Sequence, residues 1–358
     1  MKLLFVVYGS LEQISGGYLY DRMVIDYLED HGVRVELLRL PPCPYPLCPL
    51  QNFRAVLRRA FMTAGTYDCI LIDELTHPSV FLAVSRRAAA VPVVVLLHHL
   101  KARERIGTLQ RVFVRAMEAR LLGGVDAVIV NSRTTKDTIR HLVRADTAVY
   151  VCPPGSDTFA GMPAPLARDP QIAPESSDPD PVRLLVTGNL IPRKGHDLLM
   201  RMLGSLTDLH WELRVVGGIV DRRFKRRVDR LARRAGVRER VRYTGVLAGK
   251  ALYREYLEAD VFVFPSRYEG FGIALAEAVR AGLPFVAFAS GAVPEVTGGR
   301  GLFAEPGDLR FFQDKLRRLI EDAEYRDHYA RLSARLSEIL PTWRQTGEAF
   351  LKALREIV

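Results

Sequence analysis

Short apolar runs alternate with longer amphipathic stretches along both halves of the chain. In the first half the apolar runs are Leu3–Val7, Val33–Leu38, Cys69–Asp73, Val93–Leu97, Ala127–Val130 and Ala148–Val151. In the second half they are Leu184–Val186, Trp211–Val216, Val241–Thr244, Val261–Phe264 and Phe285–Ala287. This alternation is typical of βαβ units, whose parallel strands are buried on both faces. Each half is therefore expected to form an α/β domain with a doubly wound parallel sheet.

A segment without periodicity separates the two halves. Residues 161–181 are dense in Pro, Asp and Ser, a composition that can neither propagate a helix nor bury one face. We expect an N-terminal Rossmann-like domain over residues 1–165, a linker over 166–181 and a C-terminal Rossmann-like domain over 182–341. The helical pattern of residues 342–358 fits packing back on the N-terminal domain or on the other one. A length of 358 residues agrees with two domains of about 100–200 residues each.

The sequence also limits the cellular setting. No apolar stretch reaches the roughly 20 residues that span a bilayer. The N-terminus enters a strand pattern at Leu3 without the features of a signal peptide, so we expect a cytoplasmic protein. Four cysteines are too few for a disulfide framework, and we expect them to be reduced. Cys43 and Cys48 share a proline-rich loop, but no second Cys or His pair nearby completes a zinc site.

Ligands of open parallel sheets bind beyond the carboxyl ends of the strands, so the turns after the apolar runs are the candidate sites. Gly16 and Gly17 precede an amphipathic helix, where bare N–H groups favour an anion, although an ordinary glycine turn is equally consistent. In the turn Gly188–Gly195, Arg193 and Lys194 lie beside a predicted helix start and would suit a phosphate. A solvated basic loop is the alternative, and the turn is not a Walker loop.

The turn after Val261–Phe264 carries two glutamates. Glu269 lies in a glycine-containing turn and Glu277 lies in the helix that is expected to start near Gly272. A carboxylate accepts hydrogen bonds at both oxygens and suits the diols of a sugar nucleotide, so Glu269 would bind a hexose and Glu277 a ribose. The small apolar neighbours of Glu277 predict a buried helix, where a lone carboxylate is costly without a partner. This favours a functional role over an exposed helix face. In a fourth turn, Gly291 could admit a ligand and Glu295 could cap or orient the neighbouring loop. A purely structural role for Glu295 is equally consistent.

With these residues in view, the chain resembles glycosyltransferase family 4, the glycogen synthase-like group 1 glycosyltransferases, over nearly its whole length. The paired-glutamate motif from Glu269 to Glu277 is the most specific match. The other matching segments are Gly16–Gly17, Gly188–Gly195, Gly217–Gly218, Tyr243–Gly245, Pro265–Ser266, Gly282–Pro284, Gly291–Glu295 and Pro306–Asp308. The resemblance implies the GT-B fold, in which two doubly wound Rossmann-like domains face each other across a cleft.

The resemblance also implies residue roles. Lys194 would neutralise the pyrophosphate as the leaving group gains charge, Glu269 would bind the transferred sugar, and Glu277 the ribose. His98 matches a histidine on the acceptor side of the cleft, although the spacing alone does not separate it from His99. The remaining donor-binding positions would be Gly17, Gly188, Asn189, Arg193, Gly270, Phe271 and Gly272.

Asn189 departs from the family pattern, which usually has Arg at this position. Asn cannot supply a cationic bidentate clamp. Arg193 would have to reach the same phosphate, so the strength of donor binding depends on where Arg193 lies.

The expected reaction is transfer of a hexose-type sugar from a nucleoside diphosphate sugar to an acceptor hydroxyl, with retention at the anomeric carbon. The acceptor would be a lipid-linked compound or a cell-envelope or polysaccharide precursor. The family precedent implies no metal and no cofactor, and no Asp-x-Asp cluster lies in a candidate active turn. The sequence leaves two alternatives: a nucleotide-sugar 2-epimerase and a catalytically weak basic binding protein.

The charge balance favours an anionic partner. Lys and Arg exceed Asp and Glu by ten, and basic clusters lie in residues 51–62 and 222–234. In residues 51–62 the arginines alternate with Phe53, Val56, Leu57 and Phe61, which would suit peripheral association with an anionic membrane. A solvated Arg-rich surface is the alternative. No recognised nucleic-acid module is present, so no nucleic-acid partner is expected.

Overall fold

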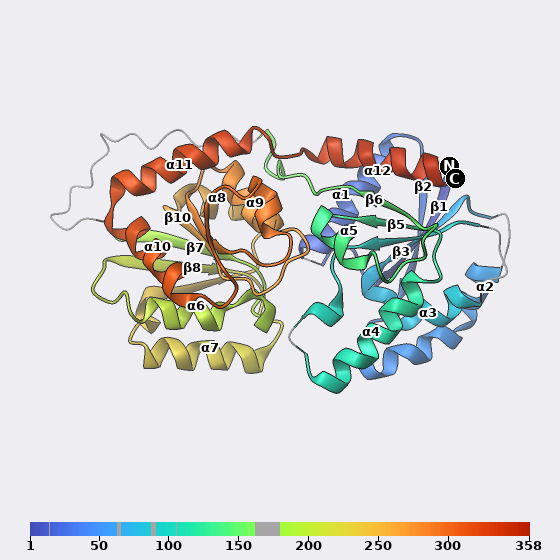
Figure 1. Cartoon of the computed structure of the whole chain (residues 1–358), viewed down its shortest axis with the longest axis horizontal. Coiled ribbons are helices and arrows are strands. Elements are labelled where there is room, and N and C mark those ends of the chain that lie inside the picture. The colour runs from blue at the N-terminus through green and yellow to red at the C-terminus, as the bar shows by residue number, and fades with distance from the viewer. Residues whose placement is uncertain (14, 63–65, 87–90, 105, 162–179) are drawn as a thin grey trace. The chain divides into compact units, whose positions relative to one another are not determined.

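The computed structural model describes residues 1–13, 15–62, 66–86, 91–104, 106–161 and 180–358. These residues form two compact units (Figure 1). The first unit comprises Met1–Pro154 together with Thr342–Val358, and the second comprises Gly155–Pro341. Most of the linker expected over residues 166–181 lies outside the described residues. The chain passes from the first unit to the second after Pro154, ahead of the expected boundary at residue 165.

The first unit contains a six-stranded parallel sheet with strand order β2-β1-β3-β4-β5-β6. Helices α1 and α12 lie on one side of this sheet, and α3 and α4 lie on the other (Figure 1). The strands are β1 (Lys2–Tyr8), β2 (Arg34–Leu40), β3 (Cys69–Asp73), β4 (Val93–Leu97), β5 (Ala127–Val130) and β6 (Ala148–Val151). The helices are α1 (Gly16–Asp30), η1 (Tyr45–Phe53), α2 (Ala55–Met62), η2 (Glu74–Thr76), α3 (His77–Ser85), η3 (Lys101–Arg103), α4 (Thr108–Leu122), α5 (Arg133–Ile139) and α12 (Trp343–Ile357), where η denotes a 3₁₀ helix.

The second unit contains another six-stranded parallel sheet, with strand order β12-β11-β10-β7-β8-β9. Its strands are β7 (Val182–Thr187), β8 (Trp211–Val216), β9 (Val241–Gly245), β10 (Val261–Phe264), β11 (Phe285–Phe288) and β12 (Leu302–Ala304). Its helices are η4 (Pro192–Lys194), α6 (His196–Leu203), α7 (Arg222–Arg234), η5 (Arg238–Arg240), α8 (Gly249–Glu258), α9 (Ile273–Arg280), η6 (Val293–Thr297), α10 (Leu309–Glu321) and α11 (Ala323–Ser337). All the predicted strands are present, and β12 is one further strand that the apolar pattern did not indicate.

The sheet of the second unit is buried on both faces. Leu184 and Val186 of β7 pack into one apolar cluster with side chains of α6, α7 and α10, whereas Leu185 packs into another with α8 and α9. Successive side chains of a strand point to opposite faces, so both positions must be apolar. This explains why the strands read as continuous apolar runs rather than as an alternating pattern.

The strand orders place the loops that can bind a ligand. In the second unit the chain runs from β7 outward through β8 and β9, and then returns to β10 on the other side of β7. The loops after β7 and β10 therefore diverge, and such switch points form crevices at the carboxyl edge of a sheet. In the first unit the corresponding pair is β1 and β3, which both flank the switch point.

Among the described residues, no helix is both long and apolar enough to cross a bilayer. Helix α12 packs against α1 in the first unit. A Cβ added at Gly347 of α12 would lie 2.1 Å from the ring of Tyr27 on α1, so the two helices can approach only because residue 347 is glycine.

Candidate active site

The two loops of the switch point in the second unit bring three charged side chains together. The Nζ of Lys194 donates a hydrogen bond to Oε1 of Glu269 over 2.7 Å, and a guanidinium nitrogen of Arg193 donates to Oε2 over 2.8 Å. Arg193 also donates to the backbone carbonyl of Tyr268. Glu269 is buried, with 7% of its surface exposed. The cluster carries two cations and one anion, so it would attract an additional negative charge.

Burial alone would raise the pKa of the Glu269 carboxyl, but Lys194 and Arg193 hold it at about 2. Burial also lowers the pKa of the Lys194 ammonium, an effect that the carboxylate opposes. Glu269 is therefore ionised throughout the physiological range. It holds both cations in fixed positions, which is the preorganisation that electrostatic stabilisation of a leaving phosphate requires.

Glycine makes the close approach of these loops possible. Gly195 links η4 to α6 and has φ +72°. A Cβ at this position would lie only 1.9 Å from the carbonyl oxygen of Pro265, so no other residue fits. Gly188 follows β7 with φ +140°, and a Cβ there would lie 3.1 Å from the aliphatic stem of Lys194. The backbone at Gly188 thus passes close to the Lys194 side chain.

Asn189 has a local partner in this loop. Its side-chain oxygen accepts a hydrogen bond from the backbone N–H of Gly218 over 2.9 Å. Gly217 precedes this contact, and a Cβ there would lie 2.2 Å from the carbonyl oxygen of Gly188. Asn189 therefore links the turns after β7 and β8, while the cationic contribution of the loop comes from Arg193 and Lys194.

Glu277 lies on α9 and is buried, with 5% of its surface exposed. The hydroxyl of Tyr256 on α8 donates to Oε2 of Glu277 over 2.9 Å and also lies 3.1 Å from the hydroxyl of Thr187. Burial raises the pKa of the Glu277 carboxyl to about 7, although hydrogen bonds from Tyr256 and Thr158 lower it. The predicted burial of Glu277 is confirmed, and its carboxylate can titrate near neutral pH.

The segment between the two glutamates forms the start of α9. Gly272 caps this helix with φ +109°, as the sequence predicted, and the Phe271 side chain is buried against the core. Gly270 lies between Glu269 and this cap. The first N–H groups of a helix have no acceptor within the helix, so the start of α9 favours an anion.

An ion pair next to this cluster was not visible in the sequence. Arg267 donates two hydrogen bonds to the buried Asp197 at the start of α6, over 2.7 and 3.0 Å. The bidentate pair ties the loop after β10 to α6. Arg267 and Asp197 are far apart in the chain, and only the pairing of β7 with β10 brings them together.

His98 and Gly17 belong to the first unit, where they form a separate group. The Nε2 of His98 lies 2.9 Å from Oδ1 of Asp21, and a Cβ on Gly17 would lie 3.4 Å from the His98 ring. Burial alone would lower the pKa of His98, but Asp21, and then Asp73, raise it. Burial and Asp21 raise the pKa of Asp73 to about 7. Asp21 and Asp73 were missed because their positions depend on the pairing of β1, β3 and β4.

Two clusters in the described part of the first unit have ligand atoms spaced closely enough to hold a metal ion. The first is Asp21, Asp73 and His98, and the second is Glu74, His77 and Glu118, each with its ligand atoms within 4.8 Å of one another. In the second cluster both nitrogens of His77 already make hydrogen bonds, to the Glu74 carbonyl and to the Tyr45 hydroxyl. A metal there would have to displace one of them.

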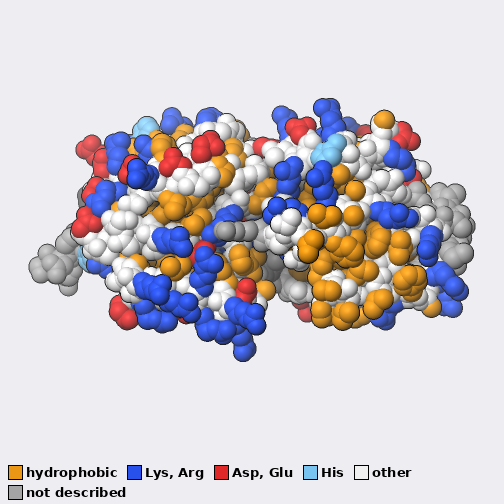
Figure 2. Space-filling view, turned by 60° about the horizontal axis from the view of Figure 1, so that its bottom comes forward, with side chains coloured by type: hydrophobic (Ala, Val, Ile, Leu, Met, Phe, Trp, Pro, Cys, Tyr) orange, Lys and Arg blue, Asp and Glu red, His pale blue; other side chains and the backbone are white. Residues whose placement is uncertain are grey.

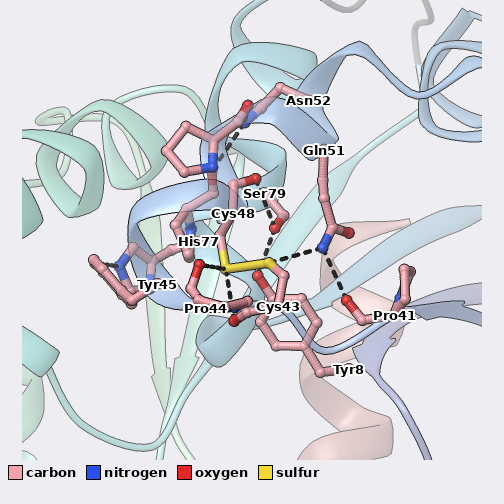
Figure 3. Close-up of a disulfide and its surroundings, with 12 residues drawn as sticks. Tyr8, Pro41, Cys43, Pro44, Tyr45, Cys48, Gln51, Asn52, His77 and Ser79 are labelled. Atoms are coloured by element: carbon pink, nitrogen blue, oxygen red, sulfur yellow. Dashed lines mark hydrogen bonds between the residues drawn. A yellow bond between two sulfur atoms is a disulfide. The ribbon is translucent and has the colours of Figure 1, made fainter.

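The cysteines correct an expectation from the sequence. Cys43 and Cys48 are joined by a disulfide at the start of η1 (Figure 3). Cys69 and Cys152 are free and buried. The free pair behaves as predicted for small core hydrophobes. The bonded pair does not, because the proline-rich turn brings its two sulfur atoms into contact.

The basic segment 51–62 also differs from its predicted amphipathic surface. Leu57 and Phe61 of α2 are buried in the core of the first unit, whereas Phe53 and Val56 are exposed. Only part of the apolar face expected to contact a membrane is therefore available on this segment.

Comparison with known proteins agrees with this geometry. Residues 167–335 match the family model described as glycosyl transferases group 1, and residues 15–155 match the model described as glycosyl transferase 4-like domain. Together these models account for most of the chain, which belongs to the group 1, family 4-like glycosyltransferases. These relationships do not favour the epimerase alternative.

Among curated relatives, a GDP-mannose-dependent alpha-(1-6)-phosphatidylinositol monomannoside mannosyltransferase of Mycolicibacterium smegmatis is 31% identical over 59% of this chain and 56% of its own length. A D-inositol 3-phosphate glycosyltransferase of a Nocardioides species is 28% identical over 94% of this chain and 78% of its own length. The structure of a sucrose-phosphate synthase from Thermosynechococcus elongatus has a TM-score of 0.80 at 20% identity, covering 99% of this chain and 98% of its own. This last likeness establishes the GT-B fold.

Proposed function

We propose that this protein transfers a hexose-type sugar from a nucleoside diphosphate sugar to an acceptor hydroxyl, with retention at the anomeric carbon. The observation that carries the proposal is the buried cluster of Lys194, Arg193 and Glu269 at a sheet switch point. Such a crevice suits a nucleotide. The relatives support a sugar-transfer reaction, because both are glycosyltransferases and the one from Mycolicibacterium smegmatis is GDP-mannose-dependent.

The residues take complementary roles in the proposed reaction. Lys194 and Arg193 neutralise the diphosphate as the bond between the anomeric carbon and the phosphate oxygen breaks. Glu269 accepts hydrogen bonds from the transferred sugar, and Glu277 accepts them from the ribose. The acceptor oxygen bonds to the same face of the anomeric carbon, and its proton passes to the departing diphosphate. Because two side-chain cations supply the positive charge, we propose that no metal or cofactor is needed.

Proposed partners follow from the same chemistry. The donor is a nucleoside diphosphate sugar, and the acceptor carries a free hydroxyl and belongs to glycolipid, cell-envelope or polysaccharide synthesis. His98, held by Asp21, is proposed to contact the acceptor side of the reaction.

Thermal shifts test donor binding directly. The protein would be titrated with UDP, GDP, ADP and TDP and their sugars. We expect the nucleotides of one base, and not those of the other three, to raise the melting temperature. Lys194→Met and Glu277→Ala should abolish that shift, whereas Lys250→Met, an exposed lysine at the start of α8, should retain it. If no nucleotide shifts the wild-type protein, the proposal is wrong and a basic binding protein becomes the better account.

The stereochemistry and the metal requirement need a product assay. Once a donor is identified, the anomeric configuration of the transferred sugar by NMR should match that of the donor, and excess EDTA should leave the rate unchanged. An inverted product, or a rate restored only by a divalent metal, would contradict the corresponding part of the proposal.

A further inference from the structure

The first unit exposes a row of apolar side chains along η1. A 3₁₀ helix has three residues per turn, so residues at i, i+3 and i+6 lie in one line. Leu47, Leu50 and Phe53 occupy such a line and are 53%, 66% and 66% exposed, and Val56 follows them at the start of α2. No folding requirement explains large apolar side chains on the solvent side.

The opposite side of η1 is fixed to the body of the unit. Cys48, Gln51 and Asn52 are buried, and Asn52 bonds to the Pro78 carbonyl and to the N–H of Leu82 on α3. Gln51 bonds to the Pro41 carbonyl, and the disulfide closes the turn that precedes it (Figure 3). The exposed row is therefore presented by a rigid support.

Helix α4 has two apolar faces. Val114, Met117 and Leu121 are buried in the first unit. On the solvent side Leu109, Val112 and Phe113 are 89%, 65% and 52% exposed, at the i, i+3, i+4 spacing of a single helix face. The solvent face of a helix in water is normally polar, so this second apolar face points to a contact outside the chain.

The two apolar rows meet on one face of the first unit. Both η1 and α4 pack against α3, and Figure 2 shows hydrophobic side chains gathered on this unit with Lys and Arg at their border. We call the exposed apolar residues of η1, α2 and α4 the apolar face: Leu47, Leu50, Phe53, Val56, Leu109, Val112 and Phe113. Large contiguous patches of this kind mark sites of protein or membrane interaction.

The charges around the apolar face favour a membrane over a second copy of this chain as its partner. Residues 41–62 and 106–117 contain five arginines and no acidic residue. Those arginines, Arg54, Arg58, Arg59, Arg111 and Arg115, are all exposed. Apolar side chains that enter the acyl boundary, bordered by arginines that meet anionic headgroups, are the pattern of interfacial membrane binding. A symmetric contact with a second copy of this chain would place these arginines against one another.

We propose that the apolar face binds peripherally to an anionic lipid bilayer, with Leu50, Phe53, Leu109 and Phe113 inserting at the headgroup boundary. This inference does not depend on the proposed sugar-transfer reaction, because it concerns a different surface and can be tested without any sugar nucleotide.

Vesicle co-sedimentation tests the proposal. The wild-type protein should bind phosphatidylglycerol–phosphatidylcholine vesicles, and bind pure phosphatidylcholine vesicles much less. Leu50→Glu/Phe53→Glu and Leu109→Glu/Phe113→Glu should each weaken binding by about tenfold or more, because two apolar side chains no longer leave water. The matched control is Phe311→Glu/Ile339→Glu, which changes exposed apolar residues of the second unit and should bind like the wild type.

Two further variants separate insertion from simple charge attraction. Arg226→Ala/Arg230→Ala removes exposed charges from α7 in the second unit and should leave most of the vesicle binding intact. A Leu50→Trp reporter should shift its fluorescence to the blue and be quenched by brominated lipid. The other tryptophans, Trp211 and Trp343, are buried and give a constant background.

The proposal is wrong if both glutamate pairs bind vesicles as the wild type does, or if only the α7 variant loses binding. It is also wrong if the glutamate pairs convert a dimer to a monomer in analytical ultracentrifugation without changing vesicle binding, because the apolar face would then bind a second copy. Far-UV circular dichroism spectra and melting temperatures like those of the wild type would show that these variants are folded.

Discussion

At the scale of single residues, the two glutamates of the second unit occupy opposite electrostatic environments. Glu269 contacts two cations, and its pKa of about 2 keeps it ionised. Glu277 contacts only hydroxyl groups among its identified partners, and burial raises its pKa to about 7. A permanently charged group can fix the position of Lys194, whereas a carboxyl that titrates near neutrality makes ligand binding sensitive to pH.

We predict that Glu277→Gln stabilises the protein at high pH and weakens nucleotide binding. The folded-state pKa lies above the ordinary value of 4.5, so ionisation costs stability as the pH rises from about 4.5 to about 7. At 1.36 kcal/mol per pKa unit, the variant should gain up to about 3 kcal/mol at pH 8.5 and nothing near pH 4. Urea unfolding at the two pH values measures the difference.

The same variant should bind the nucleoside diphosphate about tenfold or more weakly, because an amide replaces a charged acceptor of the ribose hydroxyls. Affinity of the wild type should fall as the pH drops below 7. If Glu277→Gln raised the free energy of unfolding equally at both pH values, ionisation of Glu277 would not be what destabilises the wild type at high pH.

A second prediction concerns the pair of His98 and Asp21 in the first unit. Asp21→Asn should lower the pKa of His98, because Asp21 is the main group that favours the imidazolium. The remaining Asp73 carboxylate should make this decrease partial. An NMR titration of the histidine ring protons measures it, with Asp26→Asn, an exposed position on the same helix, as the control. An unchanged His98 titration would show that Asp21 does not set its protonation.

Sequence could identify only those site residues whose chemistry is local. Lys194 and Glu269 stand next to glycines in turns that follow apolar runs, and Glu277 lies among small apolar residues in the helix after one of these turns, so the local sequence indicated all three. Asp21 and Asp73 lie in an ordinary helix and at the end of an ordinary strand. Their contact with His98 depends on the order of β1, β3 and β4 in the sheet, which no local pattern specifies.

At the scale of elements, strands were predicted better than surface segments. Buried parallel strands produce continuous apolar runs, and β3, β4 and β10 have the predicted bounds. Strand β12 has only three residues at the sheet edge, too few to form a run. The proline-rich stretch has a loop composition, but from Tyr45 onward it belongs to η1, whose buried Asn52 finds a partner on α3 that is distant in sequence.

Docking of α12 on the first unit depends on one glycine. Gly347→Ala would place a methyl group 2.1 Å from the near end of the Tyr27 ring, which cannot swing away easily because it stacks on His31. We expect the free energy of unfolding to fall by about 1–3 kcal/mol. Thermal or urea denaturation measures the loss. The exposed neighbour Glu348→Ala should change stability by less than about 0.5 kcal/mol, and equal effects of the two variants would contradict the tight packing.

At the scale of the whole molecule, the candidate functional groups are distributed over two units with separate cores. The cationic cluster and Glu277 lie in the second unit, whereas His98 and the apolar face lie in the first. The second unit is one continuous segment, but the first requires the chain to return to it at Thr342. The sequence indicated two domains, but it could not show on which of them the C-terminal helix packs. The amphipathic pattern of a helix shows which face is buried and not which sheet buries it.

This division predicts that nucleotide alone affects mainly one unit. A nucleoside diphosphate should slow amide hydrogen exchange in residues 188–196 and 269–278, where the loops after β7 and β10 offer N–H groups to phosphates. Exchange in residues 15–25 and 108–116 of the first unit should change little. Glu277→Ala should remove the protection, which ties it to the proposed ribose contact. Protection confined to the first unit would mean that the nucleotide binds near His98, and the assignment of the second unit as the donor-binding unit would then be wrong.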